Sequence, residues 1–145
     1  MIDTCVFCAI VAGPAPASVV WEDAQVVAFV DLRQPVPGRV LVVPRVHAPQ
    51  LHDLDEDSAA QLMRVAHRVV CAMQQCWAPA GSNLWQSNGV AGGQEVPHVH
   101  LHVQPRRDVD GLLRFYPEGV PLPASRDLLD ALATQLRGVL EPGRE

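Results

Sequence analysis

The sequence predicts an α+β fold in which about five antiparallel strands form one sheet, covered on one face by a long helix and a short N-terminal helix. Apolar segments of strand length follow one another through short turns rich in Gly, Pro or acidic residues, and such short connections favour antiparallel neighbours. Residues 55–77 carry apolar side chains at three- and four-residue spacing, the period of an amphipathic helix. A chain of 145 residues suits one domain, so we expect a single domain over residues 1–145.

The first half of the chain predicts the short helix and three strands. A helix over residues 5–11 is expected to end at Gly13-Pro14, because glycine terminates helices and proline cannot continue them. Glu22-Asp23 suits a hairpin turn between the first two strands. The strands are expected over residues 18–22, 26–31 and 39–44, with a Pro-Val-Pro-Gly turn over residues 35–38.

The second half predicts the long helix, two further strands and a tail. Asp55 or Asp57 can cap the start of the long helix, and Pro79 and Gly81 end it. The last strand is expected to stop at Pro105. The strands are expected over residues 82–88 and 96–104, with a glycine-rich loop over 89–94 and a terminal helix over 125–140 in the tail, residues 108–145.

Charge and hydropathy argue against several classes of partner. The net charge is −5 and Arg106-Arg107 is the only adjacent basic pair, which disfavours nucleic-acid binding. No apolar run approaches the length that spans a bilayer. The first four residues lack the basic start and the long apolar stretch of a secretory signal. We therefore expect a cytoplasmic protein that binds neither nucleic acid nor membrane, with its cysteines as thiols.

Three histidines alternate with aliphatic residues just before Pro105. Because alternate side chains of a strand share a face, His98, His100 and His102 are expected to line one face while Val99 and Leu101 enter the core. Near neutral pH, imidazole can act as nucleophile, acid, base, hydrogen-bond donor or metal ligand. The pattern therefore predicts an active site. The alternatives are an exposed strand that uses histidine as its polar residue, and a pure metal site.

The glycine-rich loop over residues 89–94 leads directly into the histidine segment. Glycine lets the backbone approach a ligand closely and present N–H groups to phosphate oxygens. A hairpin connection also uses glycine, so the loop is informative because of its position beside the histidines.

The pair Cys5-x-x-Cys8 allows three interpretations: a redox pair, half of a metal site, or two buried small residues. A closed zinc site needs four ligands. His47 and His98 are the candidates for the other two.

The segment from Gly93 to Arg106, GQEVPHVHLHVQPR, resembles the signature of the histidine triad family, in which three histidines alternate with apolar residues. The resemblance is strongest to the bacterial branch of nucleotide-binding and hydrolase proteins. It covers about residues 5–107, including the segments around Cys5, Asp31 and His47. One departure is Gln104, a polar residue at the last apolar position of the signature.

That resemblance assigns roles to individual residues. His100 is expected to attack the α-phosphorus of a nucleotide, forming a covalent nucleotidyl-histidine that water or another acceptor resolves. His102 is expected to contact phosphate oxygens, and His98 to support the site or bind metal. The expected nucleotide contacts are Asp31 at the ribose hydroxyls, Leu32 at the base, Gly93 and Gln94 at the phosphate, and either Ser87 or Asn88 where the family commonly has asparagine. For Asp31, the alternative is an ordinary turn residue at a strand end.

The resemblance implies a nucleotide hydrolase that cleaves nucleoside phosphoramidates, dinucleoside polyphosphates or aminoacyl adenylates at the α-phosphate, with a purine nucleotide or dinucleotide as substrate. The alternatives are a nucleotidyltransferase or phosphorylase, and a non-enzymatic nucleotide-binding regulator. A homodimer is also implied, as is a structural Zn²⁺ ion bound by Cys5, Cys8, His47 and His98. The alternative to the zinc site is that His47 bonds a backbone group and the thiols are free.

Overall fold

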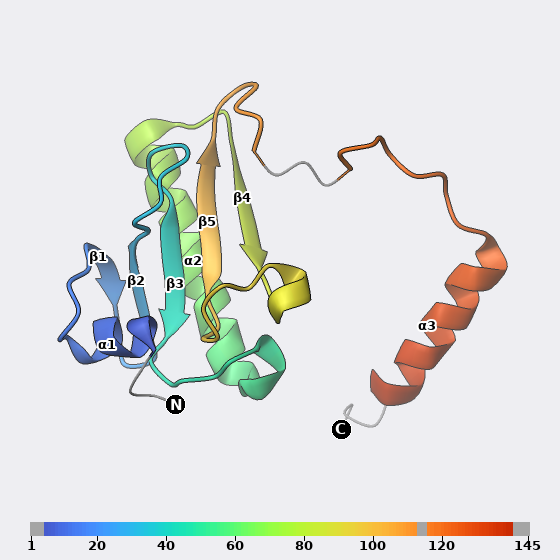
Figure 1. Ribbon diagram of the computed structural model, residues 1–145, viewed down its shortest axis with the longest axis horizontal. Coiled ribbons are helices and arrows are strands. Elements are labelled where there is room, and N and C mark those ends of the chain that lie inside the picture. The colour runs from blue at the N-terminus through green and yellow to red at the C-terminus, as the bar shows by residue number, and fades with distance from the viewer. Residues whose placement is uncertain (1–4, 113–115, 141–145) are drawn as a thin grey trace. The chain divides into compact units, whose positions relative to one another are not determined.

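The structure is a computed structural model that describes residues 5–112 and 116–140. The chain divides into two compact units, residues 1–110 and 111–145. The first unit contains the sheet and the whole signature region (Figure 1). The second contains α3 (Arg126–Leu140), in agreement with the helix expected in the tail. Residues 1–4, 113–115 and 141–145, which belong to the expected single domain, lie outside the described residues.

Five strands form one sheet in the order β1-β2-β3-β5-β4, and each neighbouring pair is antiparallel. The predicted α+β fold with a five-stranded antiparallel sheet is therefore confirmed. The strands are β1 (Val19–Glu22), β2 (Val26–Val30), β3 (Val40–Pro44), β4 (Gly81–Gln86) and β5 (Leu101–Arg106).

The two faces of the sheet are covered by different helices, and the expectation that both helices share one face is wrong. The apolar side chains of α2 (Glu56–Trp77) pack against alternate strand residues such as Ala28 and Val42. On the opposite face, Phe7 of α1 (Val6–Ala12) packs with Phe29 and Leu41 (Figure 1). The central strands are apolar on both faces, so each face needs its own cover.

The α-helices α1 and α2 both have identifiable cap residues. The thiol of Cys5 caps α1 by accepting the backbone N–H of Cys8, and Gly13 ends the helix at φ 100°. Of the two candidate caps for α2, Asp55 is the one used, because its carboxylate accepts the backbone N–H of Ser58 at 2.8 Å. These caps satisfy N–H groups that a helix leaves without intrahelical partners.

The last two strands differ from their expected bounds. β5 begins at Leu101 instead of residue 96, because the preceding backbone bonds elsewhere: the N–H of Val99 donates to Ala48 at 2.8 Å. β5 also continues through Pro105 to Arg106. Beyond Val103 it pairs with β4 alone, so proline is tolerated on the side without a neighbour. β4 ends at Gln86, before the expected residues 87 and 88.

The described part of the first unit also contains two short 3₁₀ helices, η2 (Leu51–Asp53) and η3 (Val90–Gly92). In the described part of the chain, no helix combines the length and apolar character required to cross a bilayer.

The carboxylate of Asp23 joins β1, β2 and α2. One oxygen accepts the backbone N–H groups of Gln25 and Val26 at 2.8 and 2.9 Å. The other accepts the indole N–H of Trp21 at 3.1 Å and the amide of Gln61 at 2.9 Å. Burial raises the pKa of Asp23, but these hydrogen bonds outweigh it and lower the pKa to about 2.

Replacing Asp23 by Asn is expected to lower the free energy of unfolding by about 1–3 kcal/mol at pH 7, because an amide places a donor against donors. The folded-state pKa lies below the unfolded value of 3.8. The stabilisation is therefore present above pH 3.8 and is lost as the pH falls toward about 2. Urea unfolding of the wild type and the variant at pH 7 and near pH 2 measures the difference in the free energy of unfolding at each pH. Asp108→Asn, at an exposed position, is the control, and an Asp23→Asn effect independent of pH contradicts the assignment.

Candidate active site

The three histidines lie where the chain enters β5, on the face of the sheet that α1 covers. His102 is paired with Leu41 of β3, and directly paired residues share a face. Phe7 of α1 contacts the rings of His98 and His100, with centroid distances of 5.8 and 5.1 Å. The rings of His100 and His102 are 4.7 Å apart. The alternation predicted from the sequence holds, since Val99, Leu101 and Val103 are buried in the core on the α2 side.

Cys5, Cys8, His47 and His98 bring four donor atoms within 4.8 Å of one another. The Nδ1 atoms of His47 and His98 are 3.3 Å apart, and the Cys8 sulfur lies 3.3 Å from His47 Nδ1 and 3.5 Å from His98 Nδ1. The Cys5 sulfur lies 3.4 Å from His98 Nδ1. The structure therefore places all four predicted ligands at one site.

These four residues fit a tetrahedral metal ion. Zinc–nitrogen bonds of about 2.0–2.1 Å place two nitrogens at tetrahedral corners about 3.3–3.4 Å apart. The His47–His98 nitrogen separation of 3.3 Å matches that spacing. Two thiols with two imidazoles are also a donor set typical of structural zinc sites.

The ring of His98 is fully buried and uses both of its nitrogens. Nε2 lies 2.9 Å from the carbonyl oxygen of Pro44. A carbonyl can only accept, so Nε2 carries the proton and Nδ1 presents a lone pair to the two cysteines and His47. Burial lowers the pKa of His98, despite the hydrogen bond to Pro44, so the ring is neutral.

His100 has one ring nitrogen bound and one free. Its Nδ1 donates to the carbonyl oxygen of His98 at 2.7 Å, which leaves the lone pair on Nε2. Burial lowers the pKa of His100, although the hydrogen bond to His98 and the charge of Asp31 act in the opposite direction. A buried, neutral imidazole with a fixed free nitrogen can act as a nucleophile.

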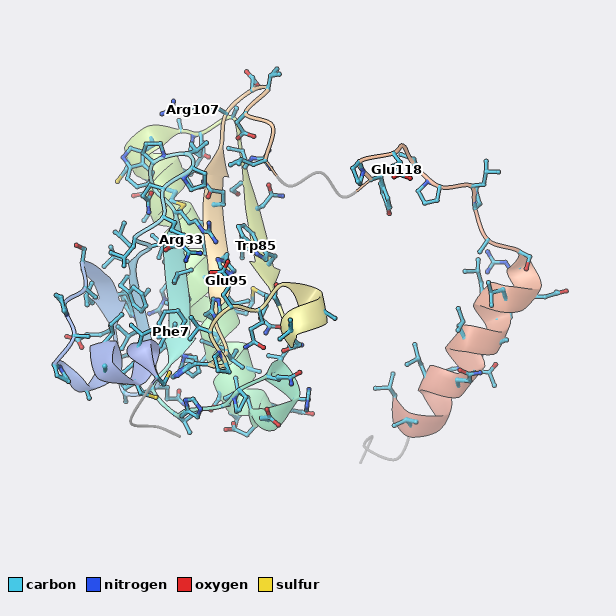
Figure 2. The ribbon with its side chains drawn as sticks, in the orientation of Figure 1. Phe7, Arg33, Trp85, Glu95, Arg107 and Glu118 are labelled. Atoms are coloured by element: carbon cyan, nitrogen blue, oxygen red, sulfur yellow. The ribbon has the colours of Figure 1, made fainter. Side chains whose placement is uncertain are left out.

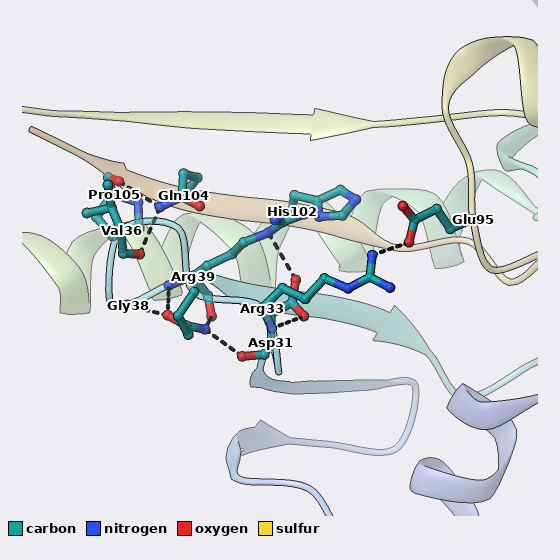
Figure 3. Close-up of polar contacts among 10 residues, drawn as sticks. Asp31, Arg33, Val36, Gly38, Arg39, Glu95, His102, Gln104 and Pro105 are labelled. Carbon is teal, nitrogen blue, oxygen red and sulfur yellow. Dashed lines mark hydrogen bonds and ion pairs between the residues drawn. The ribbon is translucent and has the colours of Figure 1, made fainter. Parts of the chain in front are cut away.

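His102 is held by Arg39 and Trp85. A guanidinium nitrogen of Arg39 lies 2.7 Å from His102 Nδ1, and the indole of Trp85 on β4 stacks on the imidazole at 4.4 Å with 7° between the planes (Figure 3 shows the Arg39 contact). Burial, together with His100 and Arg39, lowers the pKa of His102 to about 3. His102 is therefore neutral, with its other nitrogen able to donate.

Asp31 follows β2 and forms an ion pair with Arg39, whose Nε is 3.0 Å from the carboxylate. The other oxygen of Asp31 accepts the backbone N–H of Arg33 at 3.0 Å. The side chain of Gln34 closes this loop by donating to the carbonyls of Asp31 and Arg39 and accepting the N–H groups of Gly38 and Arg39. The loop thus brings a carboxylate and a guanidinium to the histidines as one unit.

The glycine-rich loop is a closed turn. The N–H groups of Gly92, Gly93 and Gln94 donate to carbonyls within the loop. The side chain of Gln94, expected at the phosphate, accepts the N–H of Gly89 and donates to the carbonyl of Pro49. The structure therefore uses Gln94 to hold the loop, and Gly93 to end η3 at φ 82°.

The remaining predicted contacts lie at the edges of the site. Asn88 accepts the N–H of Leu51 at 2.8 Å and so anchors η2, whereas Ser87 lies beside it, half-buried. Leu32 is 98% exposed. The neighbouring Arg33 forms an ion pair with Glu95 across the site, and Figure 2 shows both side chains in front of the sheet.

Sequence reasoning missed Arg39, Trp85 and Phe7. A signal was present for Arg39, because it lies two residues before Leu41 and thus on the same face of an otherwise apolar segment. Trp85 gave no such signal, since an aromatic residue is common in strands for packing alone. Gln104, the polar departure from the signature, is buried and donates to the carbonyls of Val36 and Pro105 (Figure 3).

Comparison with known proteins matches residues 12–109 to the protein family described as the HIT domain. The chain is 35% identical over 104 residues to Protein hit of Bacillus subtilis, and the match covers 72% of each protein. It is also 35% identical over 103 residues to adenosine 5'-monophosphoramidase hnt1 of Schizosaccharomyces pombe, covering 71% of this chain and 74% of that protein.

The fold is similar to the crystal structure of a zinc-bound histidine triad family protein from Mycobacterium smegmatis. The TM-score is 0.72 at 34% sequence identity. The match covers 96% of this chain and 99% of the other.

Proposed function

The chain belongs to the histidine triad (HIT) family, and from this premise we propose that it hydrolyses nucleoside phosphoramidates or dinucleoside polyphosphates at the α-phosphate. A relative named adenosine 5'-monophosphoramidase supports a nucleotide hydrolase at the level of the family. The observation that carries the proposal for this chain is the 2.7 Å hydrogen bond from His100 Nδ1 to the His98 carbonyl, because it leaves Nε2 as a free nucleophile.

The reaction then runs in two steps. Nε2 of His100 forms a bond to the α-phosphorus while the bond from phosphorus to the amine or polyphosphate breaks. An amine leaves with a proton taken from solvent water, and a polyphosphate leaves as its anion. The imidazole becomes positively charged, and its Nδ1–H stays bonded to the His98 carbonyl, which stabilises that charge. Water then attacks phosphorus and loses a proton to solvent, the electron pair of the P–N bond returns to Nε2, and nucleoside monophosphate is released with His100 again neutral.

The other site residues would bind the substrate. His102 donates to a phosphate oxygen, and Asp31 accepts from the ribose hydroxyls. Leu32, exposed beside Asp31, offers an apolar surface to a purine base. The glycine-rich loop would lie along the phosphates, with Gln94 holding its shape and Ser87 and Asn88 on its border. The homodimer and the cytoplasmic location remain predictions from the sequence.

We also propose that Cys5, Cys8, His47 and His98 hold zinc in this protein. Their spacing and donor chemistry fit the ion, and a zinc-bound relative has the same fold. When bound, zinc would supply a structural link and no catalytic water, since all four positions are filled by protein. The link would fix α1, and with it Phe7, against the histidine segment.

His100→Ala is expected to reduce kcat/KM for adenosine phosphoramidate by at least about 10³-fold, because the nucleophile is lost. Intact-protein mass spectrometry after mixing should show a transient adenylyl adduct in the wild type that the variant lacks. Release of AMP is measured in the same samples. The control is His67→Ala, at an exposed position of α2 on the far side of the sheet. It should form the adduct and release AMP as the wild type does.

Other outcomes separate the alternatives. AMP or adduct formation unchanged in His100→Ala would rule out His100 as the nucleophile. An adduct that turns over only with an added acceptor would identify a transferase. Binding of nucleotide by the wild type without adduct or AMP, for phosphoramidate and dinucleoside polyphosphate alike, would leave a nucleotide-binding regulator.

Cys8→Ser is expected to abolish stoichiometric zinc binding, because a closed tetrahedral site loses one of its four ligands. Elemental analysis of purified wild type should give about one zinc per chain, and of Cys8→Ser less than about a fifth of that. Removing zinc by a chelator should lower the Tm of the wild type by about 5–10 °C, and zinc should restore it. Cys71→Ser, at an exposed cysteine outside the cluster, should match the wild type. Equal zinc content in both variants would refute the ligand assignment.

A further inference from the structure

Arg39 is an almost buried cation with three defined contacts in the site. Its side chain is 18% exposed, and that of its ion-pair partner Asp31 is 13% exposed. Besides Asp31, it contacts Nδ1 of His102 at 2.7 Å and lies over the ring of Trp85, with the guanidinium carbon 5.1 Å from the centroid. Each contact uses a different property of the guanidinium: its charge, its N–H donors and its flat face.

The contact with His102 fixes where the imidazole proton lies. A guanidinium is always protonated and can only donate, so Nδ1 of His102 must accept. The neutral ring then carries its proton on Nε2. Trp85 stacks on the same ring at 4.4 Å, and this restricts rotation that would exchange the two edges of the imidazole.

We propose that Arg39 is a positioning residue that holds His102 in the tautomer with a proton on Nε2, so that His102 donates to an oxygen of the α-phosphate that His100 attacks. This role rests on the proposed function, because the phosphate is the acceptor. In the opposite tautomer, a lone pair would face an anionic oxygen and repel it. The charge of Arg39 helps to keep His102 neutral, and its directed N–H group fixes which nitrogen of the neutral ring carries the proton.

The arrangement also links two parts of the substrate site. Asp31, the proposed ribose contact, and His102, the proposed phosphate contact, bond to the same guanidinium. Gln34 fixes the backbone of Arg39 and of Asp31 at once. Figure 3 shows Asp31 and His102 on either side of Arg39.

Nitrogen-15 NMR of histidine-labelled protein tests the tautomer directly and needs no activity. In the wild type, His102 is expected to show an unprotonated Nδ1 and a protonated Nε2, with its signals assigned from their loss in His102→Asn. In Arg39→Met, which keeps the length but removes the donors, the two tautomers should mix. Arg39→Lys keeps a charged donor but loses the flat face over Trp85, so it should restore part of the wild-type pattern.

The kinetic arm uses the same variants with adenosine phosphoramidate. Arg39→Met is expected to lose about 10²-fold in kcat/KM, the scale of one lost donor to the reacting phosphate, and Arg39→Lys to recover part of that loss. Arg64→Met, at an exposed arginine on α2, is the control and should behave as the wild type.

A wild-type His102 protonated on Nδ1 would overturn the proposal without any variant, as would Arg39→Met with unchanged tautomer and rate. A rate loss in Arg39→Met with an unchanged tautomer would also overturn it, since the loss would then have another cause. If the wild type cleaves no nucleotide, the proposed function fails, while the NMR spectrum still decides the role of Arg39.

Discussion

The site depends on the placement of His98, a fully buried residue whose ring and backbone are both committed. Its Nε2 donates to the carbonyl of Pro44 at the end of β3, and its Nδ1 faces the two cysteines and His47. Its carbonyl oxygen accepts the proton of His100. His98 thus takes part both in the cluster of Cys5, Cys8 and His47 and in the orientation of the proposed nucleophile, so the two are linked through a single peptide unit.

The second constraint is that the imidazoles stay neutral. Burial is the main cause that lowers the pKa of His98, His100 and His102. A neutral imidazole has one proton and two nitrogens, so its chemistry depends on which nitrogen carries the proton. Backbone carbonyls decide this for His98 and His100, and Arg39 decides it for His102. The chemistry of the site therefore depends on which ring nitrogen of each of the three histidines carries the proton, as well as on the presence of the histidines themselves.

The five-stranded sheet and the face on which each histidine lies could be predicted from the sequence, because side-chain alternation follows from strand geometry. The buried positions of Val99, Leu101 and Val103 and the convergence of Cys5 and His98 appear as expected. The start of β5 could not be predicted, since the backbone before it bonds to a distant loop at Ala48. The same holds for Gln94, whose amide bonds to Gly89 and Pro49, and for Arg39, whose partners are set by tertiary structure. Local pattern gives the face of a side chain, and long-range packing gives its partner.

The spacing of the site residues along the chain also has a consequence for folding. Cys5 and His98 are separated by 93 residues, and Arg39 and His102 by 63. Contacts of such separation incur the loop-closure entropy of most of the first unit before they contribute any stabilisation. The pairing of β3 with β5 brings these segments together, so the assembled site requires that pairing. A nascent chain that has not yet emerged through β5 lacks the last strand of the sheet and His102, so it cannot yet hold the proposed site.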